Sequence, residues 1–208
     1  MIRIRYYLSL PPKTSCQDVE RRTMELRQFC MDQPFDAVSN MVETFGVEAL
    51  RNADAVTFPN QFFRRLTPKA KVGFEAALGD GDQSRPFSMF LFQYGRFRSV
   101  TVPWFMDGCC WTGIHLSDDL FLPRHLAVIS ALDKAKEMGF EVEVKDGGGY
   151  WKSRSKQRLL AVKRLMDQYP DPRILVPTIG NNSITSPQKW MNCVDMTQTE
   201  GNMGEGRG

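Results

Sequence analysis

The chain has 208 residues, 42% hydrophobic and 25% charged, which is typical of one globular domain and excludes a disordered or fibrous chain. A formal net charge of +3 falls well short of the concentrated positive charge that makes nucleic acid the default partner. The sequence has no apolar run long enough to suggest a membrane span and no signal-peptide pattern at its start, so we expect a cytoplasmic protein without membrane contact.

The first 32 residues predict a strand followed by a helix. Apolar and polar side chains alternate from Ile2 to Leu10, a pattern that indicates a half-buried strand. Ser15 and Asp18 resemble a capping box, and they predict a helix over about 16–32.

We expect residues 34–85 to form a mainly helical insertion after this first helix. Its best-defined helix would begin at Thr67, which can cap the N-terminus, and end at Gly79, which can terminate it. Pro68 would suit the first helical position.

The second half of the chain predicts a hairpin, a long helix, a strand and a last helix. The strand-like runs 86–93 and 96–104 meet at a tight turn, Tyr94-Gly95. Ser117, Asp118 and Asp119 predict the start of the long helix, and Gly139 predicts its end. The alternating run 140–146 predicts a strand, and 153–169 predicts the last helix.

This order of elements predicts an α+β fold containing the ferredoxin-like split β-α-β-β-α-β arrangement, with a helical insertion and an extra C-terminal helix. We expect one domain over 1–182 and a polar, flexible tail over 183–208. The first and last strands should lie side by side and antiparallel, with Arg3 and Arg5 facing Glu141 and Glu143.

Two adjacent cysteines and a histidine in the stretch GCCWTGIHL form the first candidate site. A thiol enzyme needs a thiolate stabilised by a nearby histidine or helix N-terminus, and Cys109 or Cys110 with His115 could meet that need. A zinc site adding His125 is a weaker alternative, because adjacent cysteines are poor ligands for one ion. The spacing matches no nucleophile signature. We therefore expect a buried connection between strand and helix, with reduced thiols, no metal and no cofactor.

Positive charge at the start of the last helix forms the second candidate site. Three glycines lead into two aromatic and four basic residues, at a helix end where acidic residues are favoured. A docked anion would relieve this arrangement, and a carboxylate such as Asp146 could compensate it. The predicted partner-binding or anion-binding residues are Tyr150, Trp151, Lys152, Arg154, Lys156 and Arg158.

These patterns predict a non-catalytic protein that binds an acidic protein partner, such as a bacterial-style accessory, immunity or regulatory protein. The alternatives are the thiol enzyme above and a nucleic-acid-binding module. For the latter, aromatic residues alternate with arginines at the hairpin tip, over Tyr94, Arg96, Phe97 and Arg98.

Overall fold

The computed structural model describes residues 1–45, 69–79, 84–94, 96–97, 100–101 and 103–168. The predictions for the tail, 183–208, and for Gly95 and Arg98 of the hairpin tip lie outside these residues. The described elements in chain order are β1 (Ile2–Ser9), α1 (Cys16–Met31), β2 (Ala37–Val38), β3 (Val42–Phe45), β4 (Ala70–Ala77), β5 (Phe87–Gln93), β6 (Arg96–Phe97), β7 (Val100–Thr101), β8 (Phe105–Thr112), α3 (Asp118–Glu137), β9 (Glu141–Asp146), α4 (Tyr150–Ser153) and α5 (Lys156–Gln168).

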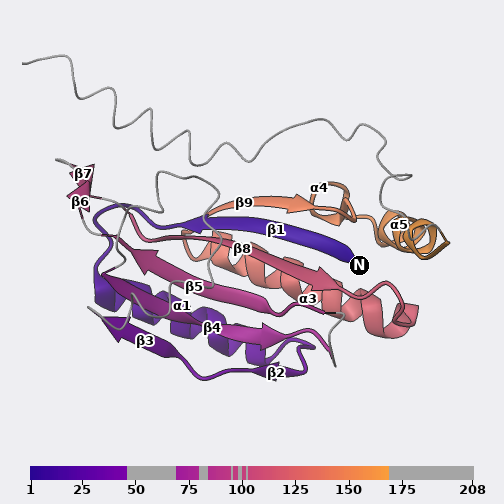
Figure 1. Ribbon diagram of the computed structural model, residues 1–208, viewed down its shortest axis with the longest axis horizontal. Helices are drawn as coiled ribbons and strands as arrows, with labels where there is room; N and C mark the ends of the chain where they lie inside the picture. Colours follow the sequence, from indigo (N-terminus) through magenta and orange to yellow (C-terminus); the bar gives the residue numbers. More distant parts are fainter. Residues whose placement is uncertain (46–68, 80–83, 95, 98–99, 102, 169–208) are drawn as a thin grey trace, which may run out of the picture.

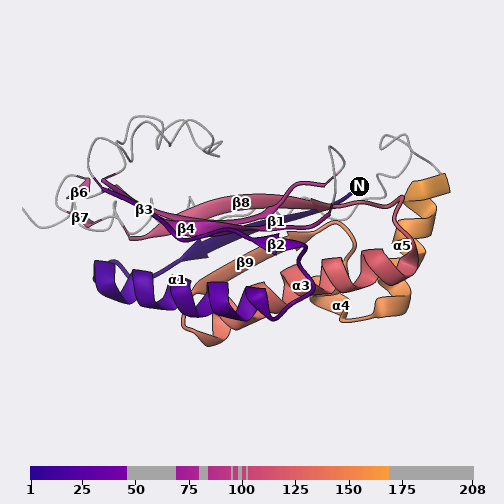
Figure 2. The same cartoon turned by 90° about the horizontal axis from the view of Figure 1, so that it is seen from below.

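The described elements form a mixed α+β fold around an open antiparallel sheet of seven strands. The strand order is β2-β4-β5-β8-β1-β9, and β3 also pairs with β4 (Figure 1). Helices α1 and α3 lie against one face of this sheet (Figure 2). We refer to the opposite face as the open face. The short strands β6 and β7 pair only with each other.

The core lies between the sheet and the two long helices. Even-numbered residues of β1, including Tyr6 and Leu8, are buried on the helix side and pack with Val19 and Leu26 of α1 and Leu132 of α3. Removing a side chain of this size from water stabilises a fold by about 1.5–3 kcal/mol. The alternation predicted for the first strand is therefore confirmed.

The caps predicted for the two long helices mark their actual starts. Ser15 precedes α1, and its hydroxyl accepts a hydrogen bond from the backbone N–H of Asp18 at 3.1 Å. Ser117 stands at the N-cap of α3, followed by Asp118 and Asp119 in the first turn.

The prediction of a helical insertion is wrong wherever the structure describes it. Between α1 and β5, the described residues form the strands β2, β3 and β4. Ala70, Val72, Phe74 and Ala76 alternate on the buried face of β4, a period of two that a helical interpretation of this segment overlooked. Pairing with β5 on one side and with β2 and β3 on the other outweighs the local helix preference.

The second hairpin strand and the last helix also differ from expectation. β5 forms as predicted, but its neighbours in the sheet are β4 and β8 rather than the run 96–104. Gly108–Thr112 of the GCCWTG stretch therefore lies inside a central strand. The predicted last helix, 153–169, corresponds to α5, which begins only at Lys156, and a separate short helix, α4, precedes it across a corner at Arg154.

Strands β1 and β9 lie side by side and antiparallel as predicted, but the expected charge pairs are wrong. The register places Arg5 opposite Lys145, and Tyr7 opposite Glu143. The Arg5 guanidinium turns instead to Asp107 on β8, with Nη2 2.8 Å from Oδ2.

Candidate binding surface

The corner between α4 and α5 is fixed by Arg154, which leaves the helical conformation. Its φ of 53° is in the left-handed region, which costs a non-glycine residue about 1–2 kcal/mol. Two hydrogen bonds of 2.6 and 2.8 Å join its guanidinium to the carboxylate of Asp133 on α3. The guanidinium also lies 4.6 Å from the ring centroid of Trp151. These contacts hold the corner against the long helix α3.

The six predicted partner-binding residues divide into an anchored group and an outward group. Tyr150 and Trp151 are half-buried and pack against the core, while the charge of Arg154 is offset by Asp133. The remaining three are exposed and form no ion pair within the part of the chain that the structure describes. We call these three residues, Lys152, Lys156 and Arg158, the corner cations.

Neither helix of the corner has an acidic residue in its first turn. At α5, the hydroxyl of Ser155 caps the helix by accepting the N–H of Arg158 at 3.2 Å, a neutral cap that leaves the local positive charge in place. At α4, the compensating carboxylate is Asp146, as the sequence suggested. It accepts the N–H groups of Gly148 at 2.7 Å and Trp151 at 2.9 Å.

Asp146 also belongs to a buried polar cluster beneath this corner. The side chains of His125 and Asp146 are 0% and 1% exposed, and His125 Nε2 lies 3.5 Å from Asp146 Oδ2. On the other side of the imidazole, Nδ1 lies 3.1 Å from the hydroxyl of Thr112. The cluster joins α3, β8 and β9, and Asp146 extends it to the start of α4.

Opposing effects set the pKa of Asp146. Burial alone raises the pKa of its carboxyl, but the neighbouring imidazole of His125 and the N–H groups of Trp151 and Gly148 outweigh burial and lower the pKa below its usual value. The structure therefore favours the charged form of this buried carboxylate.

Hydroxyl, imidazole and carboxylate follow each other in this cluster in the order of a hydrolase triad. However, Thr112 is only 1% exposed and His125 is fully buried, so a substrate has no access to either. The geometry fits a structural role, in which the cluster ties the corner to the sheet.

The structure separates the members of the predicted thiol site. Cys109 and Cys110 point to opposite faces of β8, and Cys110 is fully buried among core residues. His115 lies in the loop beyond β8, where its Nδ1 is 3.2 Å from a carboxylate oxygen of Asp167 on α5. Among the described residues, no three His, Cys, Asp or Glu side chains are placed to hold a metal ion.

Burial also lowers the reactivity expected of most of the described thiols. It raises the pKa of Cys16 to about 11 and that of Cys30 to about 12, and it raises the pKa of Cys110 well above its usual value. Cys109 is half-buried on the open face.

Among the described cysteines, we expect iodoacetamide at mildly alkaline pH to modify Cys109 before Cys16, Cys30 and Cys110. These three should react at least about 100-fold more slowly than in the unfolded chain, because the thiolate is the reactive form. Peptide mass spectrometry over time measures each site separately, with urea-denatured protein as the control. Modification of Cys110 at its denatured-state rate would contradict the structure.

The buried cluster could not be found from the sequence, because Thr112, His125 and Asp146 are separated along the chain and only the packing of α3 against the sheet brings them together. The one available signal was the position of Asp146 directly before the glycine turn.

The comparisons with known proteins add no relative: no family model, no curated protein and no solved structure matches this chain. In the part of the chain that the structure describes, no helix is both long enough and apolar enough to cross a bilayer.

Proposed function

We propose that this chain is a non-catalytic binding protein of the accessory, immunity or regulatory kind, which contacts an acidic protein partner through the corner cations. The observation that carries the proposal is the exposure of Lys152, Lys156 and Arg158, without ion pairs to described residues, on a corner held in place by the Arg154–Asp133 pair. Because these cations form no ion pair with described residues, little existing stabilisation is lost when a carboxylate docks on them.

Two further parts of the proposal concern fold and location. We propose that β1, α1, β5, β8, α3 and β9 form a ferredoxin-like split β-α-β-β-α-β unit extended by β4, β2 and β3. The neighbour order β9-β1-β8-β5 and its antiparallel pairing support this. We also propose a cytoplasmic location, which is supported by free thiols at the four described cysteines.

Changing the three corner cations together to Glu tests the proposed function. Beads carrying the wild-type protein should capture an acidic protein from native-host extract in a fixed molar ratio to the immobilised protein. The triple variant should bind this recovered protein at least about tenfold more weakly at low salt. The reason is that three attractive contacts become repulsive. Isothermal titration with the recovered partner measures the change in dissociation constant.

A matched control changes Lys13, Lys69 and Lys136 to Glu. These residues are also exposed and form no ion pair to described residues. Lys13 follows the end of β1, Lys69 precedes β4 and Lys136 lies in the last turn of α3, whereas the corner lies near the other end of β1, where β9 ends. This variant has the same net charge as the corner variant and should retain binding. Equal weakening by both triple variants would contradict a specific surface, and loss of capture after nuclease treatment would point to nucleic acid instead.

A further inference from the structure

A row of three side chains crosses the open face of the sheet near the N-terminal end of β1. Trp111 on β8 lies directly opposite Arg3 on β1, and on its other side it pairs with Arg85, just before β5. Directly opposed residues of antiparallel strands project to the same face. Since the neighbours of Trp111 in β8, Cys110 and Thr112, are buried on the helix side, the row faces away from the core.

The indole of Trp111 retains a partly accessible face. Its side chain is half-buried, whereas Arg3 and Arg85 are exposed. The guanidinium carbon of Arg85 lies 5.8 Å from the ring centroid, near the outer limit for a cation–π contact. A planar ligand group can replace so weak a contact at little cost.

A second ring and cation lie on the same face. Phe90 on β5 is half-buried, and the ammonium of Lys71 on β4 lies 4.0 Å from its ring centroid. Its neighbours Met89 and Leu91 are buried in the core, so Phe90 also projects to the open face. Two rings, each with a cation beside it, are therefore presented by neighbouring strands β8 and β5.

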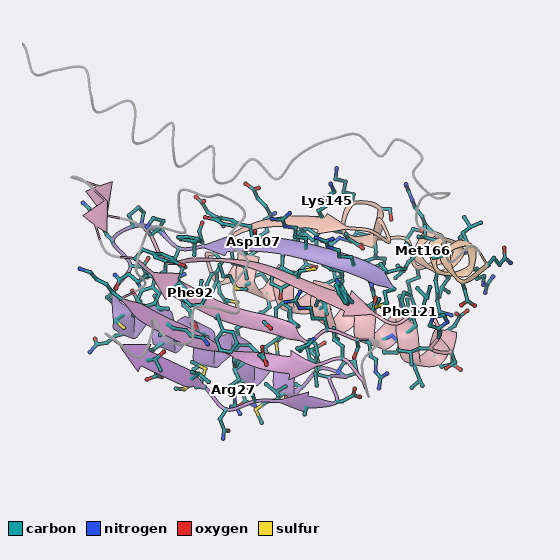
Figure 3. All side chains as sticks on the ribbon, in the orientation of Figure 1. Arg27, Phe92, Asp107, Phe121, Lys145 and Met166 are labelled. Carbon is teal, nitrogen blue, oxygen red and sulfur yellow. The ribbon has the colours of Figure 1, made fainter. Side chains whose placement is uncertain are left out.

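The charges around Trp111 are mainly positive. Arg5 offsets Asp107, and Lys145 lies opposite Arg5 on the edge strand β9 (Figure 3). Glu75 lies on β4, two strands from β8, and accepts a hydrogen bond from Ser88. The open-face acids of β9, Glu141 and Glu143, lie towards its other end.

We propose that the row Arg3–Trp111–Arg85 binds single-stranded nucleic acid, with one base stacked on the Trp111 indole and the adjoining phosphates paired with the two arginines. This site shares no residue with the corner cations and goes beyond the function proposed for them. A strand of bases and phosphates fits better than an acidic protein, because the row offers an aromatic face between two guanidinium groups. Aromatic side chains on an antiparallel sheet are a recurring platform for unpaired bases.

Fluorescein-labelled oligo-dT and oligo-U test the proposal by fluorescence anisotropy with the full chain. We expect saturable binding. Trp111→Ala should weaken it at least about fivefold, the smaller end of what one stacked base contributes. Arg3→Glu and Arg85→Glu should each weaken it and make the slope of log affinity against log salt shallower by about 0.7 per lost phosphate contact. The ratio of the two dissociation constants distinguishes DNA from RNA.

Three controls make the test decisive. Trp111→Phe, which keeps a stacking ring, should retain most of the affinity even if Trp111→Ala melts early. Lys136→Glu on α3 matches the charge change of either arginine variant and should leave binding within about twofold, as expected of a residue outside the site. The triple variant of the corner cations should still bind.

Absence of saturable binding, no effect of Trp111→Ala in a folded protein, or equal competition by inorganic polyphosphate would overturn the proposal. The proposal would also be overturned if Trp111→Ala abolished binding of a protein partner while the wild-type protein bound no oligonucleotide.

Discussion

Replacing Asp146 with Asn is expected to lower the free energy of unfolding by about 3 kcal/mol, because it removes a buried carboxylate from its polar neighbours, and each buried group left without a partner costs about 1–3 kcal/mol. The change leaves the imidazole of His125 without a carboxylate in a site closed to water. It also turns one of the two oxygens that accept the N–H groups of Gly148 and Trp151 into a donor. Urea unfolding followed by circular dichroism measures the difference.

The difference in unfolding free energy between wild type and Asp146→Asn depends on pH in a defined direction. The pKa of Asp146 in the folded protein lies below the ordinary value of 3.8, so its stabilisation is fully present above that value and disappears as the pH falls through the folded-state pKa. The unfolding free energies of wild type and Asp146→Asn should therefore become equal only in strong acid.

Asp133→Asn is the matched control, because it removes an equal charge from a partly exposed ion pair with Arg154. Its cost should be about 1 kcal/mol or less. If the two variants lose similar stability, or if the difference between Asp146→Asn and wild type does not shrink in acid, the buried cluster does not have the role assigned to it.

Gly108→Ala should produce the second large loss, about 3 kcal/mol. A Cβ at this position would lie 2.2 Å from Cε2 of Tyr6, whose ring lies over the glycine. The ring has little room to move, because the Tyr6 hydroxyl donates to the carbonyl of Ser88 at 2.8 Å and accepts its N–H at 3.0 Å. Overpacking costs about 1–3 kcal/mol, and losing these hydrogen bonds adds about 1 kcal/mol each.

The control for this prediction lies five residues along the chain. At Gly113, the nearest atom to an added Cβ would be 3.6 Å away, on Leu116, which is an ordinary contact. Gly113→Ala should therefore change stability by no more than about 0.5 kcal/mol. Thermal unfolding of both variants gives the comparison, and a Gly108→Ala protein as stable as Gly113→Ala would show that Tyr6 can move aside.

Elements with a clear local signature were predictable from the sequence. Alternation identified β1 and β9, a strand-like apolar run before a tight turn identified β5, and Ser15 and Ser117 marked the starts of the long helices. β4 was missed because Thr67, Pro68 and Gly79 are typical of helix ends, while the alternation between them was not recognised. Strand pairing, which is a long-range interaction, outweighed these local signals.

For the corner cations, the sequence predicted the basic residues but not which of them would be paired. The sequence revealed a basic helix start after a glycine turn, and three of its four exposed charges form no ion pair with described residues. It could not reveal that Arg154 is offset by Asp133, since that pair depends on how α3 packs. Likewise, the expected pairs of Arg3 and Arg5 with Glu141 and Glu143 failed because adjacency of two strands does not determine their register.

The position of β5 has a consequence for self-association. Its run FSMFLFQ is uncharged and rich in aromatic residues, the composition of segments that stack into fibrils when exposed. In the described sheet, β4 and β8 flank this strand and limit access to its backbone hydrogen-bonding groups. The outermost described strands are the short β2 and β3, which both pair with β4, at one edge and the charged β9, with Glu141, Glu143 and Lys145, at the other. Short or charged edges disfavour the addition of further strands. The native sheet therefore keeps the aggregation-prone strand β5 away from pairing with other molecules.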